Sequence, residues 1–470
     1  MGIEIKFILR RKQRMDSFVN FIVNISNWIW GTPMLVILFG GGLILSFSLG
    51  FFQFKYFGYI CKETFGKMLK KPEKGEGTVS PFQAATAALA STIGASNIVG
   101  VPVAIAFGGP GAVFWMWLTA LIGSASKFSE IVLGIKYRQK NELGEFVGGP
   151  QYYLDKGLNM PWLGKFFAFF LMLEIVPSVA TQTVSVVQTA ATLNIPNWVS
   201  GAAVAILVGI VVYGGIQRIV QVSEKLVPFM AGLYLLGALV ITIVNIGELP
   251  SILVLIFKHA FTPMAAVGGF GGAAISQAIS RGIARGTYSN EAGMGTAPIA
   301  HAAAVTDHPV RQAFWGIFEI IVDTLMVCSM TAMVVLTSGL WKTVPASEAA
   351  SMPARAFQAL LGYNLGGGIV TLSITLFVIS TIIVIVFYGE KQAEYLFGTK
   401  FAQVMKFVYL VAIFLGAYGG IEFLYSFLDI LLASIIIPNM IGLVLMRNQV
   451  KELKDDFFNN PAFYPKAKAK

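Results

Sequence analysis

The sequence predicts an all-α integral membrane protein with about eleven transmembrane helices. Apolar residues fill 56% of the 470 positions and charged residues only 12%, a composition that excludes a soluble domain. Two charge-free intervals, 17–54 and 77–126, exceed the roughly 20 residues that one crossing needs. Several such intervals therefore hold two helices, divided by glycine and proline clusters. The predicted spans are 28–52, 82–107, 112–136, 166–192, 199–215, 226–246, 265–300, 312–340, 367–388, 403–419 and 422–446.

The net charge of +10 is explained by membrane topology and not by a nucleic-acid partner. The basic residues lie between the spans, where they set the orientation of the chain in the membrane. They concentrate after the first, third and last spans, so these connections and the C-terminus are expected in the cytoplasm. This indicates a multi-pass protein of the plasma membrane, here the inner membrane of a bacterium. The basic N-terminal segment 1–27 conflicts with this scheme, since eleven spans place it outside. The side on which the N-terminus lies stays open.

The second span is interrupted near its middle. Residues 82–107 are apolar and uncharged, but their centre reads Ser91-Thr92-Ile93-Gly94-Ala95-Ser96-Asn97. Small and hydroxyl residues around a glycine predict a helix that unwinds there and exposes backbone groups to a polar ligand.

The seventh span, 265–300, has a second glycine-rich interruption, predicted at Ser276 to Gly282. Glycines that serve only close helix packing are the alternative. Two interruptions five spans apart favour an inverted five-plus-five repeat, as in many secondary transporters. The resulting organisation is a basic segment (1–27), an extra helix with a cytoplasmic loop (28–81), a first repeat (82–246), a second repeat (265–446) and a cytoplasmic tail (447–470).

Unwound helices offer two kinds of backbone group. Free N–H groups at the start of a half-helix attract a carboxylate, and free C=O groups at the end of one suit Na+ or an ammonium. The pattern therefore predicts binding of an amino acid, because these groups address both of its charged ends.

Further segments resemble the signatures of the alanine or glycine:cation symporter family, also called sodium:alanine symporters. The resemblance extends from about Trp28 to Arg447. It implies a sodium-coupled amino acid symporter with the leucine-transporter-like repeat of the amino acid–polyamine–cation superfamily, preceded by one extra helix. The segments that carry it are 90–97, 108–117 (Gly-Gly-Pro-Gly-Ala-Val-Phe-Trp-Met-Trp), 148–153, 284–293, 306–309 and 388–391.

The resemblance also implies the site residues. From the sequence alone, the hydroxyls of Ser380 and Thr381 are expected to bond back to their own helix, as such pairs commonly do. Only the resemblance favours a role in cation binding. The implied substrate contacts are Gly94, Ala95, Ser96, Asn97, Gln182, Gln277, Ile279 and Arg281, and the resemblance implies that the carbonyls of 275–279 face the ammonium of the substrate. The implied Na+ ligands are Ala90, Ile93, Phe377, Ser380 and Thr381.

Four departures from the family pattern bear on specificity. Ala95-Ser96 replaces the usual Thr-Gly at the first break, Arg281 replaces an expected tryptophan, and Ile385 or its neighbour replaces another. Gln277 also stands where a smaller residue is usual. Loss of two aromatic side chains predicts a pocket that admits glutamine beside alanine and glycine. Proton coupling is left open as an alternative to sodium.

Charged residues inside predicted spans are functional candidates, because burial in a membrane is costly. Glu319 and Asp323 are four residues apart on one helix face, so they are expected to pair with Arg281 and Arg285 in a structural network. Glu174 and Glu291 complete the set of charged candidates.

The sequence gives little support for an enzymatic function. The three histidines and two cysteines have no metal-ligand spacing, and the sequence contains no phosphate-binding loop that could couple transport to ATP. An ion channel and a non-transporting amino acid sensor remain as rival functions on the same fold. The sequence leaves the oligomeric state open.

Overall fold

Almost all of the described chain is helical. The computed structural model describes residues 19–68, 70, 75–191, 195–265, 271–418 and 422–465. Within these residues the one sheet is an antiparallel pair, β1 (Gln139–Lys140) and β2 (Phe146–Val147), with Gln139 opposite Val147. The helices are α2 (Thr32–Leu35), η1 (Val36–Gly40), α3 (Gly41–Ser48), α4 (Phe52–Lys55), α5 (Phe57–Glu63), η2 (Phe65–Lys67), α6 (Pro81–Thr92), η3 (Ser96–Gly100), α7 (Val101–Gly108), α8 (Gly111–Lys136), α9 (Pro150–Tyr152), η4 (Tyr153–Gly157), α10 (Pro161–Ala191), α11 (Asn197–Val212), α12 (Gly215–Val244), η5 (Ile246–Glu248), α13 (Leu249–Phe261), α14 (Ile275–Asn290), α15 (Ala297–His301), α16 (Pro309–Ile320), η6 (Ile321–Cys328), α17 (Ser329–Thr337), α18 (Leu340–Thr343), η7 (Ala346–Ser351), α19 (Met352–Leu361), α20 (Tyr363–Phe397), α21 (Thr399–Gly416), α22 (Glu422–Leu445) and α23 (Arg447–Asn459).

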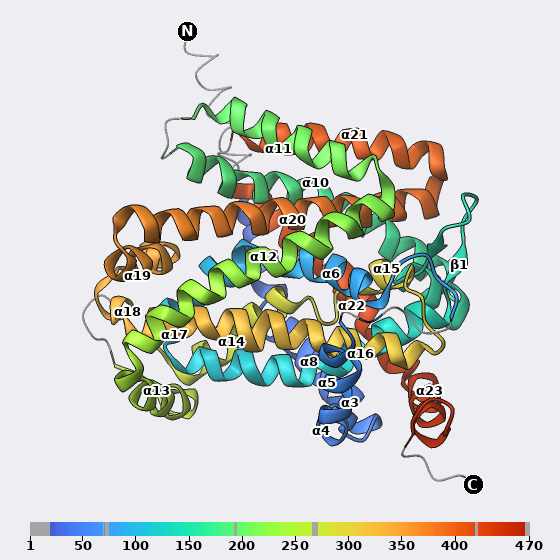
Figure 1. Cartoon of the computed structure of the whole chain (residues 1–470), viewed down its shortest axis with the longest axis horizontal. Helices are drawn as coiled ribbons and strands as arrows, with labels where there is room; N and C mark the ends of the chain where they lie inside the picture. Colours follow the sequence, from blue (N-terminus) through green and yellow to red (C-terminus); the bar gives the residue numbers. More distant parts are fainter. Residues whose placement is uncertain are drawn as a thin grey trace.

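The long helices share one general direction, as a bundle that crosses a membrane requires. In Figure 1, α8, α10, α12, α14, α20 and α21 run from side to side, with α13 and α19 at one end and β1 and α23 at the other. The predicted class, an all-α membrane protein, is confirmed. Within the described residues, eight helices are long and apolar enough to span a membrane: Val19–Ser48, Gly111–Lys136, Pro161–Gln188, Gly215–Val244, Pro309–Thr337, Tyr363–Phe397, Thr399–Gly416 and Phe427–Leu445.

A bent pair, Pro81–Thr92 with Ser96–Gly108, raises this number to nine. The remaining predicted spans correspond to α11, which is only 16 residues long, and to α14 with α15. The first span begins at Val19, earlier than the predicted residue 28. The count of eleven, the inverted repeat and the domain boundaries stay predictions.

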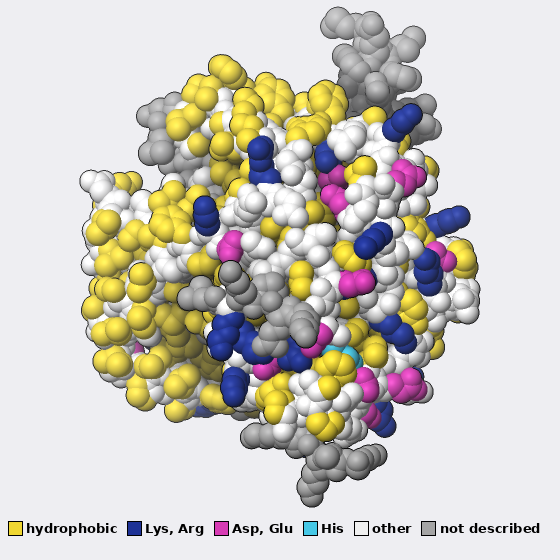
Figure 2. All heavy atoms as spheres, turned by 45° about the vertical axis from the view of Figure 1, so that its right-hand side comes forward, with side chains coloured by type: hydrophobic (Ala, Val, Ile, Leu, Met, Phe, Trp, Pro, Cys, Tyr) yellow, Lys and Arg dark blue, Asp and Glu magenta, His cyan; other side chains and the backbone are white. Residues whose placement is uncertain are grey.

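The surface separates apolar from basic side chains. Exposed apolar residues such as Ile206 on α11 and Leu236 and Val244 on α12 suit contact with lipid tails. Figure 2 shows yellow apolar side chains over its left part, whereas lysine and arginine gather over the centre and right. This separation fits a bundle with one basic end, which the positive-inside rule predicts to be cytoplasmic.

Small residues allow the central helices to approach closely. A Cβ added to Gly282 on α14 would lie 2.4 Å from the Ala112 oxygen on α8, and one added to Gly134 would lie 2.5 Å from Pro298 Cβ. Helices in membranes associate through such close packing, because lipid tails provide no hydrophobic driving force. Helices α14 and α15 pack closely against α8 in this way.

Candidate functional site: two broken helices and a buried polar network

The predicted break in the second span is confirmed. Helix α6 begins with a capping box, in which Ser80 Oγ accepts the Gln83 N–H at 3.2 Å and Gln83 Oε1 accepts the Ser80 N–H at 3.0 Å. It ends at Thr92, where Ile93 leaves the helical conformation with a ψ of 88°. The chain resumes as η3 and α7 after a bend of 51°. The chain from 93 to 95 therefore departs from a continuous helix in the buried part of the bundle.

Asn97 holds the turn at this break. Its Oδ1 accepts the Gly94 N–H at 3.0 Å, and its own N–H donates to the Gly94 carbonyl at 3.2 Å. Gly94 also allows a close approach, because an added Cβ would lie 3.2 Å from Thr381 Oγ1 and 4.0 Å from Gln182 Nε2. The structure thus brings Gly94, Asn97, Gln182 and Thr381 together.

The residues expected to bind sodium lie where α6 meets α20. Ser380 Oγ donates to the Phe377 carbonyl at 2.8 Å and lies 3.5 Å from the Ala90 carbonyl across the interface. Thr381 Oγ1 donates to the same Phe377 oxygen at 2.9 Å. Both hydroxyls therefore bond to their own helix, and both also face the end of α6. Ile93 is fully buried one turn from Ala90.

The predicted break of the seventh segment at Ser276 to Gly282 is wrong. Helix α14 runs without interruption from Ile275 to Asn290, so the carbonyls of Ile275 and Ile279 lie inside a helix. The chain unwinds later, from Glu291 to Thr296, before α15. Glu291 has a φ of 54°, a conformation that non-glycine residues rarely adopt. Residues 266–270 of the glycine-rich run lie outside the described residues.

Gln277, Ile279 and Arg281 are consequently not at the first break. A Cβ added to Gly108 would lie 3.0 Å from Arg281 Cβ and 3.1 Å from the Gln277 carbonyl, which places both beside the far end of α7. The Arg281 guanidinium lies 5.5 Å from the centre of the Phe107 ring, and the side chain is exposed. Gly108 lies eight residues beyond Gly100 along α7, which corresponds to about 12 Å at the rise of an α-helix.

Comparison with known proteins identifies the chain. The sequence model of the sodium:alanine symporter family matches residues 15–467. The chain belongs to the sodium:alanine symporter family. It is 52% identical over 454 residues to an uncharacterized transporter of Bacillus subtilis, with 96% of each chain covered.

Several relatives are named for a transport activity, among them the following two. A sodium/alanine symporter of Methanococcus maripaludis is 41% identical over 444 residues, covering 92% of this chain and 96% of the relative. A probable sodium/glutamine symporter of Bacillus subtilis is 34% identical over 469 residues, covering 96% and 94%. The resemblance inferred from the sequence motifs is confirmed, and the family is one of amino acid transporters in membranes.

In this member of the sodium:alanine symporter family, a buried network joins the two breaks. The Asn97 amide nitrogen donates to Asp323 Oδ1 at 2.6 Å and to Ser289 Oγ at 2.9 Å. Ser289 Oγ donates in turn to Asp323 Oδ2 at 2.7 Å. The end of α14 and the middle of η6 therefore contact the break in the second span directly.

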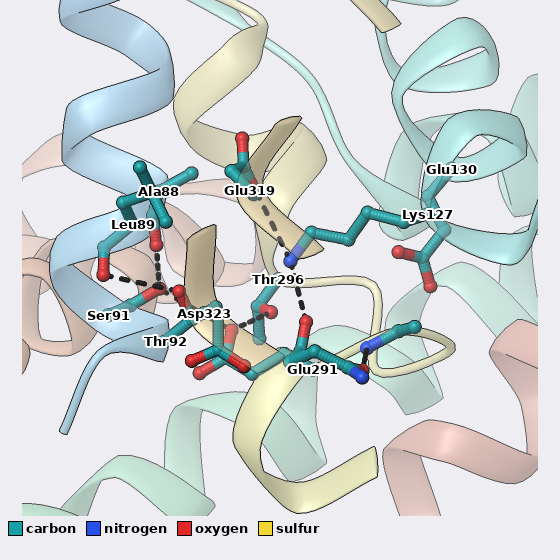
Figure 3. A network of polar contacts seen from close by, with 12 residues as sticks. Ala88, Leu89, Ser91, Thr92, Lys127, Glu130, Glu291, Thr296, Glu319 and Asp323 are labelled. Atoms are coloured by element: carbon teal, nitrogen blue, oxygen red, sulfur yellow. Dashed lines mark hydrogen bonds and ion pairs between the residues drawn. The ribbon is translucent and has the colours of Figure 1, made fainter. Parts of the chain in front are cut away.

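Glu291 provides a second connection between the unwound part of the seventh segment and α6. Its Oε2 accepts the Thr296 hydroxyl at 2.6 Å and the Ser91 hydroxyl at 3.4 Å, and Ser91 Oγ lies 3.2 Å from Tyr388 Oη. Figure 3 shows Glu291 and Thr296 together in the unwound segment, with Ser91 at the end of α6 nearby. The unwound part of the seventh segment is thus fixed to α6 and α20.

The expected pairing of Glu319 and Asp323 with Arg281 and Arg285 is wrong. Glu319 instead forms an ion pair with Lys127 at 3.3 Å, and its other oxygen lies 2.5 Å from His301 Nε2. Lys127 Nζ also donates to the Asn290 carbonyl at 3.0 Å, at the C-terminal end of α14 (Figure 3). Arg285 lies instead beside Gly100, where an added Cβ would be 3.9 Å from its Nη1.

Sequence reasoning did not single out Lys127, Glu130, Ser289 or His301. A signal was present for the first two, since both are charged residues in the predicted span 112–136. Glu130 Oε1 accepts the Asn439 amide at 2.7 Å and the Gly295 N–H at 3.0 Å, which holds the second break from the side of α8. Ser289 carried no such signal, because it has no charge and single serines are common in membrane helices.

Proposed function

We propose that the chain is a sodium-coupled symporter of small neutral amino acids that works by alternating access. Alanine and glycine are the proposed substrates, and glutamine is a larger candidate. The family and the names of two relatives, a sodium/alanine symporter and a probable sodium/glutamine symporter, support this proposal.

The observation that carries the proposal is the meeting of α6 and α20 at the first break. The Ala90 carbonyl and the Ser380 hydroxyl lie 3.5 Å apart there, with the Phe377 carbonyl 2.8 Å from the same hydroxyl. These atoms, with the Ile93 carbonyl and Thr381 Oγ1, are all oxygens, which hard cations prefer. A Na+ at this position would connect the end of α6 to α20.

The amino acid would bind beside that ion. Its carboxylate would accept hydrogen bonds from the N–H groups of Ala95, the N-cap of η3, and of Ser96, its first residue, at the positive end of the helix dipole. Gln182 lies next to Gly94 and would contact the same group or the side chain. We place the ammonium at the break of the seventh segment, near the last carbonyls of α14 and the Glu291 carboxylate, in place of the carbonyls of 275–279.

Coupling follows from the position of the ion. Na+ can favour one conformer only if it binds that conformer more tightly. A cation between Ala90 and Ser380 would stabilise the arrangement in which the end of α6 contacts α20 and Gly94 has its present turn. That arrangement presents the N–H groups of Ala95 and Ser96 to the substrate carboxylate.

The test is binding of radiolabelled alanine to the purified protein in NaCl and in choline chloride. Ser380→Ala and Thr381→Ala should each weaken the apparent Na+ affinity by roughly tenfold, as expected for loss of one buried polar ligand. Ser373→Ala is the matched control, since it removes a buried hydroxyl from α20 about two turns away. Equal alanine affinity in NaCl and choline chloride would contradict the ion assignment.

A further inference from the structure

The polar side chains near the last turns of α20 have partners, with one exception. In Figure 1, α20 runs from α19 toward the end that carries β1, where the positive-inside rule places the cytoplasm. The paired residues and their partners are Tyr388 with Ser91, Glu390 with Lys406, Lys391 with Glu145, Glu394 with Asn141 and Tyr395 with Asp155. The exception is Gln392, which is fully buried, and neither its Oε1 nor its Nε2 has a hydrogen-bond partner among the residues that the structure describes. Buried polar groups without a partner cost stability and require an explanation.

Gln392 lies on the cytoplasmic side of the proposed substrate site. It follows Thr381 by eleven residues and Tyr388 by four, so all three share one face of α20. Thr381 faces Gly94 at the first break, and Tyr388 Oη lies 3.2 Å from Ser91 Oγ near the end of α6. This face therefore leads from the first break to Gln392, about 16 Å beyond Thr381 at the rise of an α-helix.

A second glutamine with an unpaired amide group lies on α9. Gln151 is fully buried, and its Nε2 donates to the Gly148 carbonyl at 3.3 Å, whereas its Oε1 has no partner within the described part of the chain. Helix α9 packs against the second break, since a Cβ added to Gly295 would lie 2.4 Å from Pro150 Cγ. The segment 148–153 carries part of the family resemblance, but the proposed substrate and Na+ contacts leave Gln151 without a role.

Helices α9 and α20 meet at this level. A Cβ added to Gly164 on α10 would lie 2.5 Å from the Gln151 carbonyl oxygen and 3.3 Å from Tyr395 Oη. The rings of Tyr152 and Tyr395 are centred 5.1 Å apart. Gln392 lies about one turn from Tyr395 in the direction of the breaks. The two glutamines therefore belong to neighbouring elements between the breaks and the cytoplasmic end.

The chemistry of an amide suits a zwitterion. A glutamine side chain offers two N–H donors and one C=O acceptor, so it can bind either the carboxylate or the ammonium of an amino acid. It carries no charge, so it holds such a ligand less tightly than an ion pair would. Methionine, which is unbranched and apolar, would fill a similar space without unpaired groups. The unpaired amides thus disfavour the closed arrangement, and they gain partners when this end opens and a polar ligand enters.

We propose that Gln392 and Gln151 form a transient second subsite, which binds the zwitterionic amino acid on its way from the breaks to the cytoplasm. The inference rests on the proposed amino acid transport and adds a place where the substrate pauses during release. Binding at the breaks does not require the two amides, whereas passage through the cytoplasmic end does. Their removal should therefore slow release and leave the affinity of the main site unchanged.

The experiment is exchange of radiolabelled alanine across proteoliposomes with saturating NaCl and alanine on both sides, alongside equilibrium alanine binding and thermal midpoints in detergent. Gln392→Met should slow exchange roughly tenfold, as loss of a hydrogen bond to a charged group predicts. Its alanine affinity should stay within twofold of the parent, and its thermal midpoint should be equal or higher, because an unpaired buried amide is removed. Gln151→Met should act in the same direction. Gln53→Met is the matched control, since it removes a buried glutamine from α4 that contacts Ser46 at 3.1 Å.

Three results would overturn the subsite. Exchange by Gln392→Met at the rate of Gln53→Met removes the role in release, and an alanine affinity that falls in parallel with exchange moves Gln392 to the main site. A lower thermal midpoint, or failure to fold, shows that the amide stabilises the closed protein.

Gln392→Ser separates substrate from water. Its hydroxyl can bond to water but reaches less far than the amide, so exchange should stay slow; the parent rate in this variant shows that the amide serves only water, which also overturns the subsite. A parent protein that exchanges alanine equally well in choline chloride contradicts the proposed sodium coupling, while the comparison of Gln392→Met with Gln53→Met still decides this inference.

Discussion

Asn97 donates its side-chain N–H to Asp323 Oδ1 across 2.6 Å while its amide oxygen accepts the Gly94 N–H at 3.0 Å. One side chain thus links the break in the second span to a buried carboxylate on the eighth. Asn97→Ala removes both bonds and leaves a backbone N–H and a carboxylate without these partners. We expect a loss of alanine affinity of roughly tenfold to 100-fold, the usual cost of orphaned buried polar groups.

The measurement for Asn97→Ala is equilibrium binding of radiolabelled alanine in saturating NaCl. Asn141→Ala is the control, because Asn141 contacts Glu145 and Glu394 near the β1–β2 hairpin and not the break. Alanine affinity in Asn97→Ala within twofold of the control would show that Asn97 does not hold the site.

Gly94→Ala should destabilise the protein, because the new Cβ would lie 3.2 Å from Thr381 Oγ1. Overpacking of a tight interior usually costs about 1 to 3 kcal/mol. Adding Thr381→Ala removes the crowding atom and should restore the thermal midpoint, although it also removes a proposed Na+ ligand. Gly232→Ala on α12 is the control, since an added Cβ meets no atom within 4 Å there.

The thermal midpoints of these variants are measured by fluorescence in detergent. A Gly94→Ala protein as stable as Gly232→Ala, or one that Thr381→Ala fails to rescue, would contradict the close approach of α6 and α20.

Lys127→Met should be strongly destabilising, because it leaves Glu319 buried beside His301 with no ammonium. Removing one member of a buried ion pair typically costs about 3 to 5 kcal/mol. The double variant Lys127→Met, Glu319→Gln should recover much of this loss, since it removes both charges. Unfolding in mixed micelles measures the coupling, and simple additivity of the two changes would exclude a direct pair.

Arg281→Trp should leave substrate selectivity unchanged. The sequence placed this residue in the substrate pocket, but the structure places it beside Gly108, exposed and at the far end of α7. Competition of alanine, glycine and glutamine for uptake in proteoliposomes measures selectivity. A shift toward smaller substrates in Arg281→Trp would restore the original interpretation. The case for a larger pocket now depends on Ile385, which lies one turn beyond Thr381 on α20.

Glu145 provides a pH-dependent contact between the hairpin that contains β1 and β2 and α20. Burial by itself raises the pKa of the Glu145 carboxyl, but the Lys391 ammonium at 2.8 Å outweighs this and holds the pKa below its usual value. A lowered pKa stabilises the fold above the unfolded value of about 4.3, and this stabilisation is lost as pH falls through the folded value.

Glu145→Gln should therefore be less stable than the parent at neutral pH, by less than about 1 kcal/mol because the carboxylate is partly exposed. The difference should shrink as the pH falls below about 4.3. Thermal midpoints across this pH range give the comparison, and a difference that grows on acidification would have the wrong sign for this contact.

The sequence predicted one break correctly and misplaced the other, for a physical reason. At the first break, Gly94 and its small polar neighbours do interrupt the helix. In the seventh segment, Gly282 and Gly286 permit α14 to pack against α8, where an added Cβ would lie 2.4 Å from the Ala112 oxygen and 3.2 Å from Met116 Cα. Their function there is close packing, whereas the actual break begins at Glu291 and continues through Gly293 and Gly295, whose φ values of 93° and 80° favour glycine.

Pairing of charges was predictable only in part. The sequence shows that Glu319 and Asp323 share a helix with few other charges, but their partners come from other helices. Lys127 reaches Glu319 from α8, and Asn97 reaches Asp323 from η3. Local spacing does not determine such contacts, because they depend on how the helices pack. The predicted group Ala90, Phe377 and Ser380 came from the family resemblance, and the structure does bring these residues together.

The most direct test of sodium-coupled symport is uptake of alanine into proteoliposomes under an imposed inward Na+ gradient. The account predicts transient accumulation of alanine above its external concentration, which disappears when choline replaces Na+ and which Ser380→Ala reduces but Ser373→Ala does not. Accumulation that persists in choline and follows an inward proton gradient instead would contradict it.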